Sequence, residues 1–279
     1  MSDAINSAAR CKTDVPRQAV FAEMQKHFHA AHIGRSLPRI SLTHKGMDAA
    51  LGGGFLCRRV HLITGKQASL TSGFSLALIA MMLRAKKAQG PILWCGPLRG
   101  GQSGQLFGAG LAALGLRAEQ FIFVRDSHPL RRMAACEEAL ATPGLSAVIH
   151  EYGPLYEKAD LWQKSARRLQ LACENGTATA FMIGQAGSPC GFESAWDIKP
   201  ALESHHMASD WRPMWHAQLH HVRGGYPAAG NVIWDSKEAR FIVPQRQDNQ
   251  TPKPEVNKPM WEAQPYRADN QAHRWQRSA

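Results

Sequence analysis

The spacing of hydrophobic and polar positions changes along the chain, and each spacing predicts a type of element. From residue 37 to about residue 184, short apolar runs alternate with stretches in which apolar residues recur at helical spacing. The runs are typical of buried strands, and the helical spacing is typical of amphipathic helices. Strands that alternate regularly with helices predict an α/β fold, with a mostly parallel central sheet covered on both faces.

The expected elements can be given by residue range. After a short strand near Ile40 and a short helix over 47–51, an apolar strand from Arg59 leads through a tight loop into a long helix that ends at Arg84. Further strands are expected at 92–95, 121–124, 145–149 and 178–183, and helices at 105–114, 129–140 and 158–173. Three strand-like runs follow at 215–222, 231–235 and 240–243, and we expect them to be antiparallel strands at one edge of the sheet.

Composition divides the chain into three regions. Residues 1–36 form an N-terminal arm with an amphipathic helix from Pro16, which either docks on a partner or packs on its own domain. Residues 37–244 form the core domain. Residues 245–279 are rich in Pro, Gln, Asn and mixed charge, so we expect a disordered tail that binds a partner.

Bulk composition narrows the classes of function. The formal charge of +11 favours nucleic acid or an acidic partner. The six cysteines are scattered with no C-x-x-C pair, so we expect small buried thiols in a cytoplasmic protein, without a zinc knuckle or disulfide framework. No apolar run approaches the roughly 18–20 residues of a membrane helix, and no secretory signal begins the chain.

The segment from Arg59 to Leu76 predicts a strand, loop and helix arranged as in a P-loop. A working P-loop reads G-x-x-x-x-G-K-[ST]: backbone N–H groups surround the phosphates, the lysine reaches them and the hydroxyl binds magnesium. Counted from Gly65, the hydroxyl is kept at Ser72, but Leu70 replaces the second glycine and Thr71 replaces the lysine. We therefore expect an ordinary packed turn instead of a phosphate cradle. The candidate contacts to ATP are Gly65, Lys66, Ser69, Thr71 and Ser72.

Other segments carry a family resemblance. The run Gly46-Met-Asp-Ala-Ala-Leu-Gly-Gly-Gly resembles the segment that precedes the P-loop strand in RecA-like recombinases. Four further runs are Gly90-Pro-Ile-Leu-Trp-Cys95, Cys136-Glu-Glu-Ala-Leu140, Ser165-Ala-Arg-Arg-Leu-Gln-Leu-Ala-Cys-Glu174 and Val222-Arg-Gly-Gly225. With these, residues 37–244 resemble the ImuA family of damage-inducible mutagenesis accessory proteins. The resemblance implies a RecA-like P-loop NTPase fold.

The resemblance also implies a function. Such proteins act in error-prone translesion synthesis during the SOS response, beside an ImuB-like Y-family polymerase homologue and a C-family error-prone polymerase. RecA and DNA, touched directly or through a partner, are further expected contacts. Two other functions stay open: a divergent DNA-dependent ATPase of the recombinase type, and an SOS inhibitor of cell division.

An ATPase of this type also needs a magnesium carboxylate and a glutamate that activates water. The resemblance places the first at Glu151, and it places the second just after Cys95, where Gly96-Pro-Leu-Arg-Gly-Gly offers no carboxylate. Gln185 matches the glutamine that senses the γ-phosphate. We therefore expect a pseudo-ATPase with no catalytic residue, no metal site and at most weak ATP binding.

Candidate contacts to partners or DNA lie outside that motif. Lys164, Arg167 and Arg168 form one basic helix face, which contacts phosphate, contacts an acidic partner or is merely solvated. Arg223 is a further candidate. Trp261 and Trp275 stand alone in the polar tail and are typical anchors for a partner groove, although an inert extension is the alternative.

Overall fold

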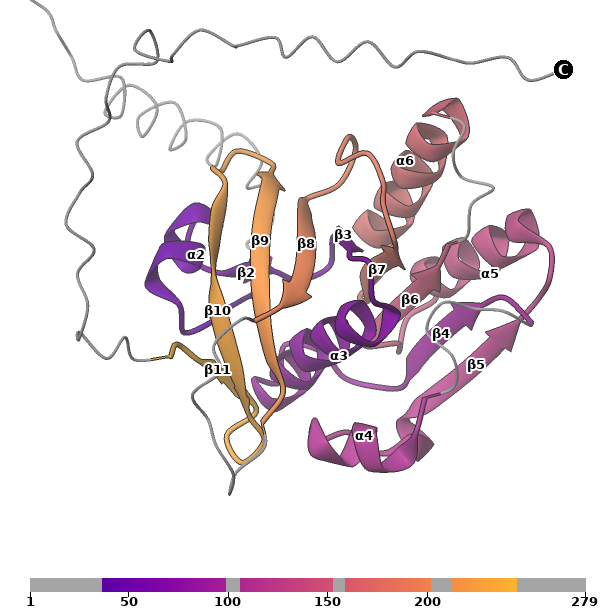
Figure 1. The fold of residues 1–279 in the computed structure, drawn as a ribbon. Coiled ribbons are helices and arrows are strands. Elements are labelled where there is room, and N and C mark those ends of the chain that lie inside the picture. Colours follow the sequence, from indigo (N-terminus) through magenta and orange to yellow (C-terminus); the bar gives the residue numbers. More distant parts are fainter. Residues whose placement is uncertain (1–36, 99–105, 153–158, 202–211, 245–279) are drawn as a thin grey trace, which may run out of the picture. The chain divides into compact units, whose positions relative to one another are not determined.

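The computed structural model describes residues 37–98, 106–152, 159–201 and 212–244 (Figure 1). The expected N-terminal helix and the tail with Trp261 and Trp275 lie outside the described residues.

The described strands form one large sheet and one small one. The large sheet has nine described strands in the order β11-β10-β9-β8-β3-β7-β6-β4-β5. Their bounds are Val60–Thr64 (β3), Ile92–Gly96 (β4), Phe121–Arg125 (β5), Ala147–Glu151 (β6), Thr179–Gly184 (β7), Ser194–Pro200 (β8), Met214–Val222 (β9), Ala228–Asp235 (β10) and Arg240–Ile242 (β11). The small sheet pairs Arg39–Ile40 (β1) with Phe55–Leu56 (β2) in antiparallel fashion.

The sheet is parallel from β8 to β5 and antiparallel from β8 to β11. Strand β3 lies inside the parallel part, between β7 and β8. These pairings confirm the α/β fold, the large mostly parallel sheet and the antiparallel extension at one edge. Strand β8 was not expected, because Ser194–Pro200 mixes Ser, Asp and Lys with its apolar residues and follows the run we took to close the series.

Helices cover both faces of the parallel part (Figure 1). Their bounds are Lys45–Ala50 (α2), Ala68–Arg84 (α3), Gly108–Ala113 (α4), Pro129–Ala141 (α5) and Ala159–Asn175 (α6). A 3₁₀ turn over Ala118–Gln120 precedes β5. Helix α3 packs on β3, β7 and β8, whereas α5 and α6 pack on the opposite face, and α2 packs on β10. No helix among the described residues is long and apolar enough to cross a membrane.

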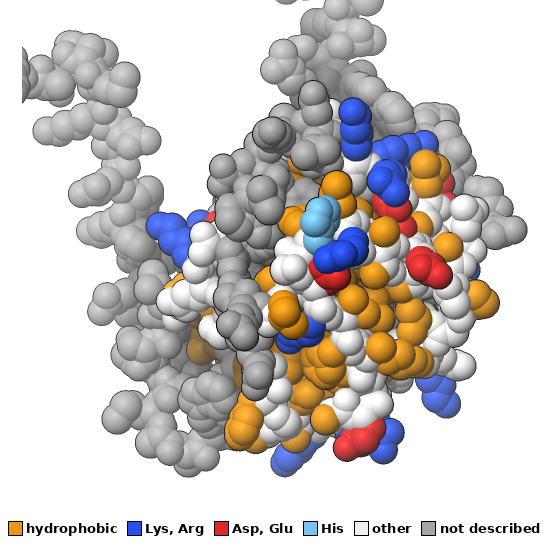
Figure 2. Space-filling model, turned by 90° about the vertical axis from the view of Figure 1, so that its right-hand side faces the viewer, with side chains coloured by type: hydrophobic (Ala, Val, Ile, Leu, Met, Phe, Trp, Pro, Cys, Tyr) orange, Lys and Arg blue, Asp and Glu red, His pale blue; other side chains and the backbone are white. Residues whose placement is uncertain are grey.

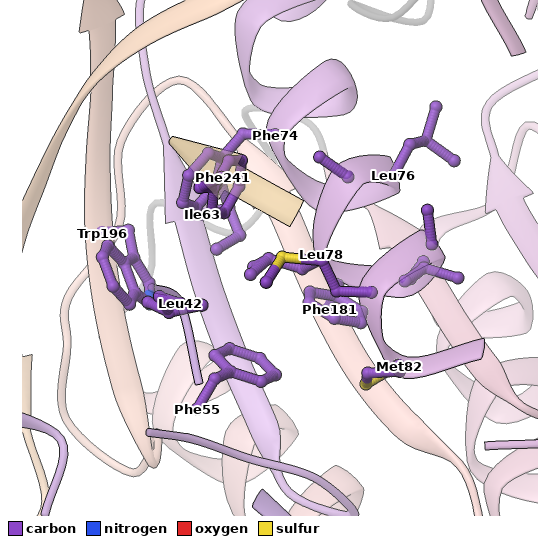
Figure 3. Close-up of a cluster of buried hydrophobic side chains, with 14 of the residues drawn as sticks. Leu42, Phe55, Ile63, Phe74, Leu76, Leu78, Met82, Phe181, Trp196 and Phe241 are labelled. Atoms are coloured by element: carbon purple, nitrogen blue, oxygen red, sulfur yellow. The ribbon is translucent and has the colours of Figure 1, made fainter. Parts of the chain in front are cut away.

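Two buried clusters follow from this layering. The larger one lies between the sheet and α3, where Phe74 stacks on Phe241 with ring centroids 5.5 Å apart (Figure 3). Helix α3 contributes apolar residues around most of its circumference, because the antiparallel strands also pack against it. The smaller cluster lies beneath α5 and α6 and includes three of the buried cysteines. A strand buried on both faces is mostly apolar, which is why β3, β4 and β7 were easy to predict in spite of His61 and Thr64 in β3.

Candidate functional site

The loop between β3 and α3 is shorter than a phosphate-binding loop. Only Gly65, Lys66 and Gln67 separate the end of β3 at Thr64 from the start of α3 at Ala68. The expected packed turn at Leu70 and Thr71 is therefore wrong in detail, since both residues already belong to the helix. Counting positions from Gly65 assumed a loop of P-loop length, and the helix begins before that loop could wrap around a phosphate.

In the first turns of α3, backbone N–H groups and a hydroxyl that could bind a phosphate are hydrogen-bonded within the helix. The backbone N–H groups of Leu70 and Thr71 donate to the carbonyl of Gln67 at 3.1 and 3.3 Å. The Thr71 hydroxyl donates to Ala68 O at 3.0 Å, and its methyl group faces Gly65. A Cβ at position 65 would lie 3.0 Å from that methyl group and 2.5 Å from the carbonyl oxygen of Ile198 on β8. The space beside Gly65 is thus filled by protein.

The five candidate ATP contacts are not brought together. Thr71 and Ser72 are buried in the helix, whereas Lys66 and Ser69 are exposed. Gly65 is buried, and its N–H donates to Gly184 O at 3.2 Å. A role in nucleotide binding for these residues stays a prediction. A nucleotide would meet the N-terminal end of α3 but no loop long enough to surround its phosphates.

The strand order does bring other expected residues to one edge. Because β3, β7, β6 and β4 are parallel neighbours, their carboxyl ends lie side by side, which is the usual place for a ligand in an α/β sheet. Gln185 follows β7 directly and is exposed, and Glu151 ends β6. The sheet therefore aligns Gly65, Gln185 and Glu151 along this edge.

An ion pair between Arg125 and Glu151 occupies the edge of the sheet where an ATPase of this type would bind magnesium and activate water. The Glu151 side chain is 1% exposed, and its Oε2 lies 4.0 Å from Nη1 of Arg125, the last residue of β5. The register pairs Gly96 on β4 with Arg125, so the glycine lies between the strands that carry the two charges. A Cβ at Gly96 would lie 2.8 Å from Glu151 Oε2 and 2.9 Å from Arg125 Nη1. The position that lacks an activating glutamate is thus the one over which Arg125 and Glu151 meet.

Two aromatic residues hold the loop after β7. The Tyr152 hydroxyl donates to Ala186 O at 2.7 Å, and Nε1 of Trp162 donates to Ser188 O at 2.7 Å. Their rings lie against Gly184 and Gly187, where a Cβ would collide with them. The recombinase resemblance places a DNA-binding loop here. Its backbone is bonded to the body of the domain, and it carries no lysine or arginine before Lys199.

Sequence comparison gives the relationship to known proteins. Protein ImuA of Caulobacter vibrioides strain NA1000 / CB15N is 29% identical over 221 residues, which is 72% of this chain and 85% of that protein. Protein ImuA of strain ATCC 19089 / CIP 103742 / CB 15 matches with the same identity and coverage. The chain is thus similar to ImuA proteins over most of its length. No family model matches it.

In this ImuA-like chain, the expected basic face lies on α6. Lys164, Arg167 and Arg168 are exposed, and Arg168 Nη2 lies 2.5 Å from Glu137 Oε2 on α5. The three residues line a groove of about 560 Å³ between α6 and α5, whose floor includes Leu130 and Met133. The structure thus brings together three of the residues proposed for partner or DNA binding.

The other expected contacts lie elsewhere. Arg223 follows β9, and its N–H donates to Glu193 O at 2.8 Å. His216 and His220 are both on β9, and Nδ1 of His216 lies 2.8 Å from Asn231 Oδ1. The tail tryptophans lie outside the described residues.

Sequence reasoning missed Arg125, Tyr152 and Trp162 at this edge. Arg125 ends an apolar strand and looked like an ordinary boundary residue. Tyr152 comes directly after Glu151, and an aromatic residue beside a candidate carboxylate was the one available signal. Trp162 is fully buried among apolar residues in spite of its position on a basic helix.

Proposed function

We propose that the chain is a non-catalytic RecA-like accessory protein of SOS-induced, error-prone translesion DNA synthesis. It acts as a scaffold with an ImuB-like adaptor and a C-family error-prone polymerase. Similarity to ImuA proteins supports a role in damage-inducible mutagenesis. The observation that carries the absence of catalysis is the Arg125–Glu151 pair over Gly96.

The order of the parallel strands supports a RecA-like relationship. One strand, β7, separates the strand of the P-loop-like segment from the strand that ends in Glu151, and β7 itself leads to Gln185. The recombinase resemblance expects a phosphate loop, a sensor glutamine and a magnesium carboxylate at these three places. At these places the chain has a glutamine at Gln185 and a carboxylate at Glu151, whereas Leu70 and Thr71 replace the second glycine and the lysine of the phosphate loop.

Each part of ATP hydrolysis is weakened in a different way. Backbone N–H groups of α3 are used within the helix, and no lysine stands where the phosphates would be bound, because Thr71 replaces it. Glu151 is buried next to a fixed cation, which competes with magnesium for its charge. The run Gly96-Pro-Leu-Arg-Gly-Gly directly after Cys95 contains no carboxylate, and losing a general base alone typically costs about 10²–10⁴ in rate.

The groove between α5 and α6 is the surface we assign to a partner. Its cations at Lys164 and Arg167 are exposed and its floor is apolar, so it suits an acidic segment that also carries a hydrophobic side chain. Figure 2 shows one face of the molecule on which hydrophobic side chains gather, with Lys and Arg side chains grouped above them. Among the described residues, Ile122 and Phe123 of β5 are exposed hydrophobic side chains.

Nucleotide binding and turnover on the purified full chain test the loss of catalysis. We expect no ATP hydrolysis above the level of the Lys66→Ala variant, with or without single-stranded DNA. Tight ATP binding together with DNA-stimulated hydrolysis that Lys66→Ala abolishes would instead establish the divergent ATPase.

Recovery of partners from damaged cells tests the scaffold role. Bait chains would be the full protein, a chain truncated after Pro244, a Lys164→Glu/Arg167→Glu variant and a Lys237→Glu control on the exposed turn between β10 and β11. We expect the ImuB-like adaptor to co-purify with the full chain and the control, and to be lost from the double variant. Loss only on truncation would move the contact to the tail. Filamentation of cells that overproduce the protein without any mutagenic polymerase would favour the division inhibitor.

A further inference from the structure

Three potential metal ligands from three elements meet beneath α5. Cys95 lies on β4, Cys136 on α5 and His150 on β6, and all three are buried. Cys95 and His150 are direct neighbours across the β4–β6 pairing, so both side chains point to the face that α5 covers. Residues far apart in the sequence therefore converge at one point inside the domain.

The spacing of the donor atoms suits a metal ion. The two Sγ atoms and an imidazole nitrogen all lie within 4.8 Å of one another, and Cys136 Sγ is 3.5 Å from His150 Nδ1. Zinc binds sulfur at about 2.3 Å and imidazole nitrogen at about 2.0–2.1 Å, so its tetrahedral ligands lie roughly 3.5–3.8 Å apart. To reach that spacing, the most widely separated pair of donor atoms would have to move closer by at most about an ångström.

A buried arginine lies beside the two cysteines. Arg132 is 2% exposed, lies one helical turn before Cys136, and its backbone carbonyl accepts a bond from Cys95 Sγ at 3.5 Å. The guanidinium donates to Asp126 O at 2.7 Å through Nη1, while its buried Nε has no hydrogen-bond partner among the described residues. The charge of Arg132 favours the anionic form of each thiol, but burial raises the pKa of Cys136 well above its usual value, so the bound metal itself has to displace the Cys136 proton.

Two other buried cysteines show what an ordinary core thiol looks like here. Cys57 and Cys173 are equally buried, and burial raises the pKa of each to about 12. Neither belongs to a group of three metal-binding side chains among the described residues. A buried cysteine in this fold therefore does not automatically lie next to other metal-binding side chains, as Cys95 and Cys136 do next to His150.

We propose that Cys95, Cys136 and His150 bind one zinc ion, which joins α5 to β4 and β6. Binding releases the two thiol protons to solvent. Two thiolates and a neutral imidazole form a soft donor set typical of zinc, and they leave the fourth position to water or a small anion beside Arg132. The ion would link α5, whose Leu130 and Met133 line the groove between α5 and α6, to the sheet.

Cobalt and zinc titrations of the reduced full chain test the site. After treatment with chelator, the wild-type protein should bind about one cobalt per chain with a thiolate-to-cobalt charge-transfer band, as expected for a Cys₂His site. The Cys95→Ala/Cys136→Ala variant should lose that band, and the Cys173→Ala control should keep it. Wild-type protein without the band would overturn the proposal, and so would a band of equal strength in the double variant.

Melting curves of the unmodified protein keep the test independent of whether the double variant folds. Zinc at about 100 times its Kd should raise Tm by roughly 5–10 °C, whereas magnesium should not. The Cys173→Ala control should respond as the wild type does. A Tm unchanged by zinc, or a Cys95–Cys136 disulfide in freshly purified protein that contains no metal, would contradict a zinc site.

Discussion

The Ser194 hydroxyl on β8 donates a hydrogen bond of 2.7 Å to Nδ1 of His61 on β3. The direction follows from the other ring nitrogen, because Nε2 lies 2.8 Å from Leu56 O, and a carbonyl only accepts. Nε1 of Trp196 donates to the same hydroxyl at 2.9 Å. The imidazole is therefore held neutral, in one tautomer, at the centre of the sheet.

This arrangement makes stability depend on pH. Burial lowers the pKa of His61 from 6.5 to about 3, so the folded protein disfavours the protonated ring. The stabilisation is complete above pH 6.5 and is lost as the pH falls toward 3. Between pH 7.5 and pH 5, His61 should cost about 2 kcal/mol in the free energy of unfolding. Denaturant unfolding at several pH values measures it, and a His61→Gln variant should show a shallower fall in this range. Equal slopes would contradict the assignment.

The contact between Gly65 and β8 predicts a purely structural effect of a larger side chain. Gly65→Ala places a methyl group 2.5 Å from the backbone oxygen of Ile198, which cannot easily move, so we expect a loss of about 1–3 kcal/mol in unfolding free energy. Gly110→Ala is the matched control, because that glycine lies within α4 with open space around it. It should be neutral or gain up to about 1 kcal/mol. Equal losses in both variants would show that Gly65 is not sterically confined.

The ion pair over Gly96 should matter for stability as well as for function. Arg125→Ala removes the guanidinium next to the buried Glu151 carboxylate, and we expect a loss of about 1–3 kcal/mol, below the full cost of a buried pair because Arg125 is 26% exposed. Arg131→Ala breaks an exposed pair with Asp126 and should change the unfolding free energy by at most about 1 kcal/mol. Chemical denaturation of both variants decides. A smaller effect at Arg125 than at Arg131 would be inconsistent with the pair described here.

The tethered loop after β7 predicts a local change in dynamics. The Tyr152→Phe/Trp162→Phe variant keeps two aromatic rings but loses both donors, and with them the hydrogen bonds to Ala186 O and Ser188 O. Hydrogen exchange over residues 185–193 should become faster, while exchange in β9 and β10 should be unchanged. Unchanged exchange in the loop would mean that packing of the rings alone holds it.

The elements of this fold could largely be predicted, because strands buried on both faces carry unbroken apolar runs. β8 could not, since only Ala195, Trp196 and Ile198 face the two cores while Asp197 and Lys199 pair at the surface, 3.1 Å apart. Strand β8 pairs in parallel with β3 and antiparallel with β9. Its sequence shows neither the continuous apolar run of a buried parallel strand nor the strict apolar–polar alternation of an antiparallel one.

The candidate site was predictable only in position. Motif spacing placed Glu151 and Gln185 at the correct edge, because strand ends are visible in the sequence. It could not show where α3 begins, nor that Arg125 reaches Glu151 across a strand whose last residue is glycine. Likewise, Cys95, Cys136 and His150 meet only because β4, α5 and β6 pack together, and no local spacing connects them.

The position of β3 also has a consequence for how the chain folds. Both of its neighbours come late in the sequence, and His61 is separated from Ser194 by 133 residues. Antiparallel strands β8 to β11, in contrast, follow one another and can pair locally. Non-local pairing is slow because loop closure must be paid for first. During synthesis, both edges of β3 therefore stay unpaired until β7 and β8 have left the ribosome. A fragment that ends before Thr179 lacks both partner strands and could not complete the sheet.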